Sequence, residues 1–345
     1  MTLSFRLRNA LKWVVSETLR WTGVLRLLER TKRDSLRILV FHRVSDIRVD
    51  DGMTVSAAVF EAQVRYLTQR HHMVPLEQVG RMLRGEGLFR GGVAVTFDDG
   101  YRDNYTRALP ALTRHKIPAT IFLAVGAVDG NASLWTEELR EALWATARES
   151  VDLKFLGWES WPLRTEPDRL ACLKAVKGRL KTMPDGARQQ VMHDIMEALE
   201  WKGPAKPQTE MLTWEMAREM RKAGIAIGAH TVSHKILTRI TRAEAEWEIA
   251  ESKRRIEKEV GEPVRHFAYP NGTRSDWNPE IQEMVKQAGF ETACTTVRGA
   301  NPVGHDAYAL RRLEINDAGC TDPFGRFSLA MFAAQLVGLF GGWER

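Results

Sequence analysis

The strongest constraint on the fold is a regular alternation of short apolar runs with amphipathic stretches of helical period, from about residue 36 to residue 316. The apolar runs have strand length, and the stretches between them place apolar residues on one side of a helix. The predicted strands are 37–42, 72–76, 93–98, 119–125, 225–230, 265–270 and 291–297, with a last one near 308–315. The predicted helices are 56–70, 103–116, 213–223, 241–260 and 279–288. This alternation predicts a mainly parallel sheet, either a closed barrel or an open doubly wound sheet, and seven or eight strands favour the barrel.

Residues 129–210 interrupt the alternation. They are helical in character and rich in tryptophan, and they end in the loop-like sequence WKGPAKPQTE (201–210). We interpret them as a helical insertion between two barrel elements, which either forms a lid or wall for substrate or has only a packing role. The predicted organisation is an N-terminal arm (1–35), a barrel (36–128 and 211–316), the insertion (129–210) and a C-terminal tail or helix (317–345).

The N-terminal arm carries the net charge of the chain. Residues 1–37 hold nine lysines and arginines against three acidic residues, whereas the rest of the chain holds 41 of each. A neutral body argues against a nucleic-acid-binding protein, because such domains carry a basic face. Apolar residues recur at helical spacing, with basic residues on the other side: Leu7, Leu11, Val14, Trp21, Leu25 and Leu28. This amphipathic helix either packs on the protein itself or on a second subunit, or lies in the plane of an anionic membrane surface.

The arm does not have the pattern of a signal peptide. Arginine and lysine interrupt it throughout, and no small-residue cleavage site follows it. It is also too polar to span a bilayer. The three cysteines, Cys172, Cys294 and Cys320, are widely spaced and odd in number, which argues against a disulfide framework. We therefore expect a cytoplasmic protein that can dock on the inner membrane; its oligomeric state is left open.

Three predicted strands end in polar residues that packing alone does not require. VTFDDG (95–100) ends in Asp98 and Asp99, IAIGAHTVSH (225–234) contains His230 and His234, and ILVFH (38–42) ends in His42. In parallel α/β folds the carboxyl ends of the strands meet at one edge, where active sites form. We therefore expect these five side chains to share one site.

Two histidines and one aspartate suit a metal ion. A His-x-x-x-His sequence on a helical turn places both imidazoles on one face, within reach of a single cation. One carboxylate completes a His₂Asp set that leaves coordination positions open, as catalytic sites do. The second aspartate can then act as a base. Each signal is weak alone, because such histidine pairs also occur on helix surfaces and Asp-Asp-Gly is often only a turn.

Taken in order, TFDDGYRDN (96–104), GIAIGAHTVSHKIL (224–237) and RHFAYPNG (265–272) resemble the motifs of the polysaccharide deacetylases, carbohydrate esterase family 4. ILVFHRV (38–44) is similar to the opening strand of the branch that deacetylates poly-N-acetylglucosamine. The resemblance covers about residues 36–128 and 211–316. It implies a distorted (β/α)7-type barrel and metal-dependent hydrolysis of an N-acetyl group on an amino sugar.

Carried onto this sequence, the resemblance implies Asp98 as the general base and Asp99, His230 and His234 as metal ligands. It implies His42 as the acid that protonates the leaving amine. The expected cofactor is a divalent metal, first of all Zn²⁺, with Co²⁺, Ni²⁺, Mn²⁺ or Fe²⁺ as alternatives. Such a metal would polarise the amide carbonyl and lower the pKa of a bound water.

The third motif departs from the family pattern. Much of the family has an arginine before the proline of this motif and a tyrosine after it, whereas FAYPNG (267–272) has Ala268 and Asn271 in those places. Another residue must then orient Asp98, and the candidates are Arg311 and Arg312 in ALRRLEI (309–315).

The remaining candidates concern the substrate. Tyr269, Asn271 and Trp277 are the predicted substrate-binding residues, with backbone N–H groups near Asn271 as donors to a tetrahedral oxyanion. Trp277 can stack on a pyranose ring or simply pack. The usual C-terminal histidine motif is not evident, so His305 is a secondary candidate for the acid after His42.

The hypothesis that accounts for these patterns is a metal-dependent hydrolase acting on an N-acetylated glycan, either a polysaccharide or a lipid-linked saccharide. Two alternatives stay open. One is a catalytically idle carbohydrate-binding protein with the same barrel. The other is a metal-dependent amidase that acts on a small amide other than a sugar.

Overall fold

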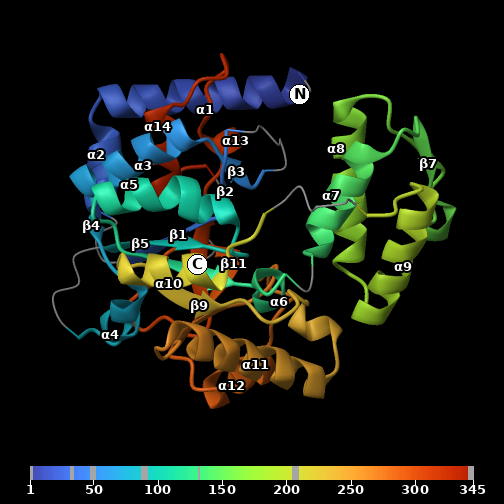
Figure 1. The fold of residues 1–345 in the computed structure, drawn as a ribbon. Helices are drawn as coiled ribbons and strands as arrows, with labels where there is room; N and C mark the ends of the chain where they lie inside the picture. Colours follow the sequence, from blue (N-terminus) through green and yellow to red (C-terminus); the bar gives the residue numbers. More distant parts are fainter. Residues whose placement is uncertain are drawn as a thin grey trace.

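The computed structural model describes residues 3–31, 35–46, 52–86, 92–130, 133–203 and 210–340. Its centre is a closed barrel of seven parallel strands surrounded by helices (Figure 1). The strands are β1 (Ser35–Phe41), β5 (Gly92–Phe97), β6 (Ala119–Leu123), β9 (Ala226–Ala229), β10 (His266–Ala268), β11 (Thr292–Arg298) and β13 (Leu310–Glu314). The barrel closes because β1 pairs in parallel with both β5 and β13. The predicted (β/α)7-type barrel is therefore confirmed.

The predicted helices lie outside the barrel. They are α3 (Ala57–Arg70), α5 (Leu109–Arg114), α10 (Trp214–Lys222), α11 (Arg242–Val260) and α12 (Pro279–Gln287). The side chain of Thr213 caps α10 by accepting a hydrogen bond from the N–H of Met216, as its sequence predicts. Ser56 occupies the corresponding position of α3, but its side chain makes no capping bond.

Two predicted elements are shorter than expected. The strand predicted at 72–76 is only β4 (His72–Met73) beside β5, since Pro75 has no N–H to continue a ladder. The helix predicted at 103–116 is α5 preceded by a π-helical turn over Asn104–Ala108. That turn sits next to the Asp-Asp-Gly sequence, which is consistent with the frequent occurrence of π turns at functional sites.

Residues 133–203 form a helical group beside the barrel, at the right of Figure 1. It contains α7 (Trp135–Ala145), a hairpin of β7 (Ser150–Asp152) and β8 (Ser160–Pro162), α8 (Glu166–Leu180) and α9 (Asp185–Ala198). The group has its own apolar core, which includes Leu139, Cys172, Val176 and Ile195. Residues 204–209, most of the predicted loop-like end, lie outside the described residues.

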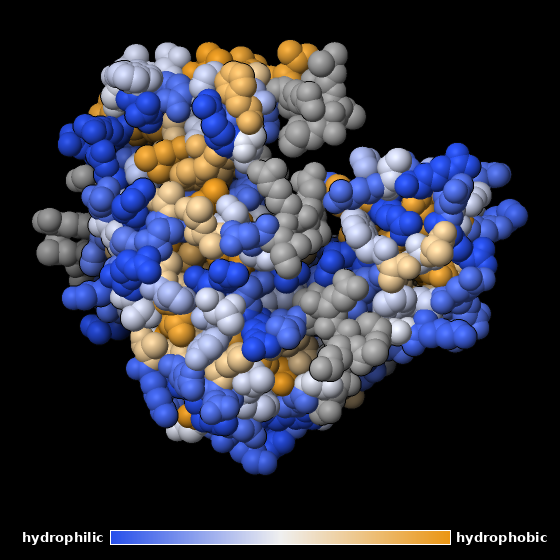
Figure 2. Space-filling view, turned by 45° about the horizontal axis from the view of Figure 1, so that its top comes forward, coloured by the Kyte–Doolittle hydropathy of each residue, from blue (hydrophilic) through white to orange (hydrophobic). Residues whose placement is uncertain are grey.

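The N-terminal arm forms two helices, α1 (Leu3–Trp21) and α2 (Val24–Thr31). One side of this pair packs on α14 (Leu329–Leu336), where Leu25 shares a buried cluster with Ala333 and Ala334. The other side is exposed: Leu7 is 63%, Leu11 67% and Trp21 78% accessible. Figure 2 shows apolar side chains along its upper edge, where α1 lies. Among the described helices, none is both long and apolar enough to cross a membrane.

Candidate metal and catalytic site

The barrel topology brings the predicted residues to one cavity. His42 follows β1, Asp98 and Asp99 follow β5, and His230 follows β9, so all of them lie at the carboxyl ends of parallel strands. A cavity of about 440 Å³ is lined by these four side chains and by His234. The wall opposite the barrel is formed by α8 and by Trp135 of α7, so the helical insertion lines the site.

The two adjacent aspartates point in different directions because of the backbone at Asp99. The N–H of Asp98 still donates to the carbonyl of Phe41 at 3.0 Å, which continues the ladder between β5 and β1. Asp99 then has a φ of +74°, in the left-handed region that costs a residue with a Cβ about 1–2 kcal/mol. Gly100 follows with φ +86°, and a Cβ there would lie 2.9 Å from Leu123 Cδ2. The turn therefore needs this glycine and separates the two carboxylates.

Asp98 is held by Arg312 of β13. The two terminal guanidinium nitrogens donate to the two carboxylate oxygens at 2.7 and 2.6 Å, and both side chains are almost completely buried. Arg312 Nε donates to the carbonyl of Thr295 at 2.7 Å, which fixes the plane of the guanidinium. Burial raises the pKa of Asp98, but the charge and hydrogen bonds of Arg312 outweigh it, so the pKa lies below the ordinary value. Asp98 is thus an oriented, ionised carboxylate.

Of the two arginines considered from the sequence, only Arg312 contacts Asp98. Arg311 precedes it in β13 and therefore points to the other face of the strand. Its aliphatic part lies against Gly299, where an added Cβ would be 2.6 Å from Arg311 Cδ. The prediction of a catalytic position for Arg311 is therefore wrong.

Asp99 converges with His230 and His234. One ligand atom from each lies within 4.8 Å of the other two, and Asp99 Oδ1 is 3.4 Å from Nε2 of His230 and 3.2 Å from Nε2 of His234. The three residues come from β5 and from the loop after β9. The structure therefore brings together the three side chains that the sequence grouped, while their role as metal ligands stays a prediction.

The His-x-x-x-His sequence does not lie on a helical turn, contrary to our prediction. The loop after β9 is irregular, and Thr231 and His234 have left-handed φ values of +64° and +54°. Glu248 of α11 fixes this loop, since its carboxylate accepts from the N–H groups of Val232 at 2.7 Å and Ser233 at 2.9 Å. Glu248 is 2% accessible. Sequence reasoning missed it, because nothing in a surface helix indicates that one glutamate reaches a distant loop.

The protonation pattern of this group fits a cation. His230 Nδ1 lies 2.7 Å from the carbonyl of Ala268, so Nδ1 carries the proton of the neutral ring and Nε2 presents a lone pair to Asp99. Burial lowers the pKa of His234, which favours its neutral form; burial acts the same way on His230, but the carboxylates of Asp99 and Asp98 outweigh it and raise the pKa of that ring. Among the described atoms, Asp99 Oδ1 and His234 Nδ1 are buried without a hydrogen-bond partner. A carboxylate facing imidazole lone pairs is repulsive unless a cation lies between them, and Zn²⁺ accepts this donor set.

The other predicted residues fall into two groups. Asn271 lines the cavity together with His42, and its side chain donates to the buried carboxylate of Asp276. Tyr269 is completely buried, its hydroxyl donates to the carbonyl of Tyr308 at 2.9 Å, and its ring stacks on Trp277 at 5.8 Å. Neither aromatic side chain lines the cavity, so the cavity gives no support to their predicted role as substrate contacts.

His305 is also remote from the cavity. Its Nε2 lies 3.0 Å from the carbonyl of Ala309, and it does not belong to the cavity lining. Of the two histidines considered as the acid, His42 alone reaches the cavity. Its position is fixed through the backbone, since its carbonyl accepts from Asn104 Nδ2 at 2.8 Å.

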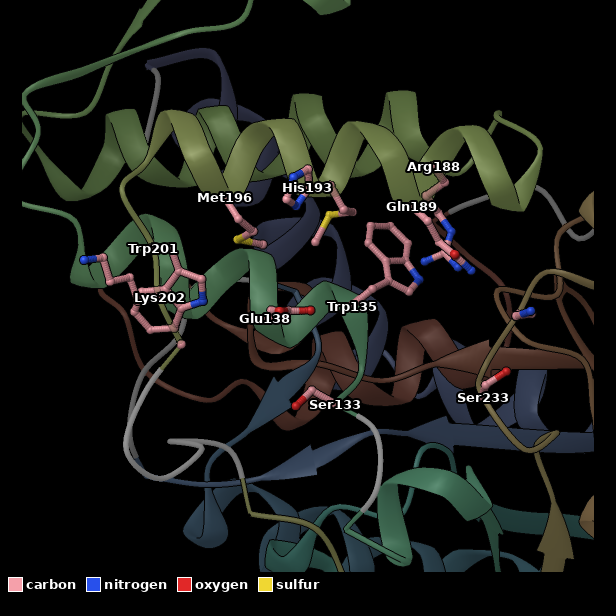
Figure 3. Close-up of a pocket in the computed structure, with 13 residues that line it drawn as sticks. Ser133, Trp135, Glu138, Arg188, Gln189, His193, Met196, Trp201, Lys202 and Ser233 are labelled. Atoms are coloured by element: carbon pink, nitrogen blue, oxygen red, sulfur yellow. The ribbon is translucent and has the colours of Figure 1, made fainter.

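A second cavity of about 570 Å³ is lined by residues of α7 and α9 (Figure 3). Trp135 lines both, and Arg188 lies over its ring at 5.0 Å. The lining also includes Glu138, Trp201 and Ser233, but none of the predicted catalytic or metal-binding residues. The predicted catalytic and metal-binding residues therefore belong to the smaller cavity.

Comparison with known proteins agrees with this geometry. A family model described as polysaccharide deacetylase matches residues 90–293, more than half of the chain. A protein of Bacillus subtilis (strain 168), YxkH, whose name assigns it provisionally to the polysaccharide deacetylases, is 22% identical over 306 residues, which are 88% of this chain and 80% of that protein.

Two solved structures share the fold. The deacetylase PplD of Streptococcus pyogenes, in complex with acetate, superposes with a TM-score of 0.56 at 18% identity, covering 84% of this chain and 96% of PplD. IcaB from Ammonifex degensii superposes with a TM-score of 0.56 at 20% identity, covering 89% of this chain and 97% of IcaB. Matched residues 90–293 contain Asp98 and the convergent Asp99, His230 and His234, but neither His42 nor Arg312.

Proposed function

Because this chain belongs to the polysaccharide deacetylase family, we propose that it is a metal-dependent hydrolase that removes acetyl groups from an N-acetylated amino sugar of a polysaccharide or lipid-linked glycan. The observation that carries the proposal is the cavity in which an Arg-held carboxylate, Asp98, lies beside the convergent Asp99, His230 and His234. Family membership supports deacetylase activity; the metal and the sugar are our proposal.

Asp99, His230 and His234 would hold the metal through one carboxylate oxygen and two imidazole nitrogens. When bound, a divalent ion supplies a Lewis acid that polarises the acetamide carbonyl and lowers the pKa of a water. The chain supplies the rest. Glu248 keeps the loop of the two histidines in place, and the carbonyl of Ala268 keeps the His230 ring in the tautomer that offers Nε2.

Asp98 accepts a proton from the attacking water, whose oxygen bonds to the acetamide carbon. Arg312 holds the carboxylate ionised and in one orientation, so the proton acceptor is positioned before the substrate arrives. A backbone N–H at Asn271 assists the oxyanion. The C–N bond then breaks, and His42 gives a proton to the amine nitrogen. The products are acetate and the free amino sugar.

The test is acetate release from a panel of N-acetylated glycans, with and without a chelator and after Zn²⁺ is added back. We expect acetate from at least one glycan, loss of activity with the chelator and recovery with the metal. A metal-loaded protein that binds glycans but releases no acetate would instead be the idle carbohydrate-binding protein. Acetate from small acetamides but from no glycan would identify the amidase.

We also propose that the protein docks on the cytoplasmic face of the inner membrane through α1 and α2. The exposed stripe of Leu7, Leu11, Val14 and Trp21 is flanked by exposed arginines, including Arg20, a combination that suits an anionic lipid surface. The cysteines within the described residues are all free thiols, which suits a reducing compartment.

A further inference from the structure

A row of three lysines, two in the last turns of α8 and the third at its C-cap, faces the active-site cavity. Lys174, Lys177 and Lys181 follow one another at intervals of three and four residues, so they share one face of the helix, and all three line the cavity with the catalytic candidates. With a rise of 1.5 Å per residue, the row extends over about 10 Å. The opposite, apolar face of α8 packs in the core of the insertion, which fixes the row in place.

These lysines have no ion-pair partner among the described residues. Lys235 and Lys253 pair with carboxylates at 3.2 and 3.4 Å, whereas none of the three cavity lysines forms an ion pair with a described carboxylate. Asp50 and Asp51, which precede the cavity residue Met53 in the chain, lie outside the described residues.

The acidic groups of the cavity are already engaged. Arg312 neutralises Asp98, and Asp99 faces the two imidazoles. Glu314 is the remaining carboxylate of the lining, and Arg298 interacts with it electrostatically. Three ammonium groups therefore lie along one wall of the space that substrate must occupy.

Burial and the charge of Lys177 lower the pKa of Lys181, and the distant carboxylates of Asp276, Glu314 and Asp99 offset this only in part. Lys181 is thus a partly buried ammonium group beside another positive charge. A bound anion would supply the negative charge that it lacks. A neutral N-acetylated glycan carries no negative charge that could neutralise these ammonium groups.

We propose that the substrate is an N-acetylated sugar carrying a diphosphate group, which Lys174, Lys177 and Lys181 bind while the acetamide lies at the metal and Asp98. The inference rests on the deacetylase function proposed above. A diphosphate diester carries two negative charges at neutral pH and so neutralises more of the charge of the three lysines than a single carboxylate on a sugar would. Lysine binds such groups as a mobile point charge.

A diphosphate can be attached to a sugar by a nucleotide or by a polyprenyl lipid. The shared chemistry is the sugar diphosphate, and the test separates the sources by including UDP-N-acetylglucosamine and a short polyprenyl diphosphate-linked N-acetylglucosamine. A neutral N-acetylglucosamine trisaccharide is the uncharged reference. The preferred source is the one with the lower dissociation constant.

Binding is measured by calorimetry on the full-length, metal-free protein, so that no metal–phosphate contact contributes. The variant is Lys174→Gln/Lys177→Gln/Lys181→Gln. The matched control is Arg179→Gln, which removes one positive charge from α8 at an exposed position outside the cavity lining. The three lysines replaced by arginine form the charge-retaining variant, and thermal unfolding checks that each variant is folded.

We expect the glutamine variant to weaken binding of a diphosphate sugar by on the order of a thousandfold, since it removes three charged hydrogen bonds that contribute about tenfold each. Arg179→Gln should change it less than threefold, the arginine variant should retain most of the affinity, and trisaccharide binding should be unchanged. Added salt should weaken only the lysine-dependent binding. Single lysine variants replace the triple variant if it does not fold.

Equal affinity of wild type and the glutamine variants for both diphosphate sugars would overturn the inference, as would tighter binding of the neutral trisaccharide by the wild type. Acetate release by the metal-loaded wild type is measured in parallel. Its absence from every substrate contradicts the deacetylase function and leaves the binding result standing, so the two failures are distinguishable.

Discussion

The buried pair of Arg312 and Asp98 gives the sharpest prediction. Arg312→Met removes the guanidinium and keeps a side chain of apolar character in the same space. Asp98 is then buried without its partner, and loses two charge-assisted hydrogen bonds of 2.7 and 2.6 Å. At roughly 1.5–3 kcal/mol for each bond to a charged group, the pair accounts for about 3–6 kcal/mol. Breaking one side of a buried ion pair costs about 3–5 kcal/mol in other proteins, which agrees.

Activity should fall together with stability. Without Arg312, we expect burial to outweigh the remaining charges of His230 and His42 and to raise the pKa of Asp98, so that the carboxylate takes a proton and no longer serves as a base. We expect acetate release to fall by about a hundredfold or more, the usual contribution of a positioned general base. Urea unfolding followed by fluorescence measures the loss of stability, and acetate release at saturating substrate measures the loss of activity.

The matched control is Arg311→Met, which removes the same charge from the neighbouring position on the other face of β13. It should cost less than about 1 kcal/mol and keep activity near that of the wild type. Asp98→Asn combined with Arg312→Met should cost less than the sum of the single changes, with a coupling of about 1–3 kcal/mol. If Arg312→Met costs less than 1 kcal/mol, or if Arg311→Met has the same effect, the assignment of Arg312 to Asp98 is refuted.

Four further outcomes are expected. Asp98→Asn should retain bound metal, measured by elemental analysis, and lose about a hundredfold or more in turnover; a near-normal rate would exclude Asp98 as the base. His234→Ala should lose metal stoichiometry as well as activity, and a variant with full metal content would contradict its role as a ligand. Burial lowers the pKa of His266 to about 3. As pH falls, the unfolded chain therefore takes up a proton on this histidine before the folded protein does. Stability should therefore decline between about pH 6.5 and pH 3, by up to about 1.4 kcal/mol per pH unit from this residue, and His266→Asn should flatten the slope in urea titrations. Leu11→Glu should reduce sedimentation with anionic vesicles by about tenfold, whereas Val303→Glu, at another exposed apolar position, should not; equal effects would rule out docking through α1.

Much of the candidate site could be predicted from short stretches of sequence. Asp98, Asp99, His230 and His42 each follow an apolar run of strand length, and parallel strands end at one edge of a barrel. Their proximity therefore follows from the fold class, which the alternation of strands and helices already indicated. No knowledge of side-chain packing was needed for this step.

The errors at the site concern the direction of side chains and the local course of the backbone. Choosing between Arg311 and Arg312 depends on the register of β13, because successive residues of a strand face opposite sides. The spacing of His230 and His234 suggested a helical turn, whereas a left-handed residue at 231 and the distant Glu248 hold them together. Tyr269 stacks on its aromatic neighbour inside the protein, a contact between separate segments that no local pattern reports.

By itself, the sequence determined the barrel, the edge at which polar residues gather and the amphipathic character of the arm. These follow from local periodicity and from chain direction, which act over a few residues. Only the tertiary structure decided that Arg312 holds Asp98, that α8 turns its lysines towards the cavity and that α1 keeps one apolar side exposed. Such contacts join segments that can lie more than two hundred residues apart in the chain. Their energies depend on register and packing that exist only once the chain has folded.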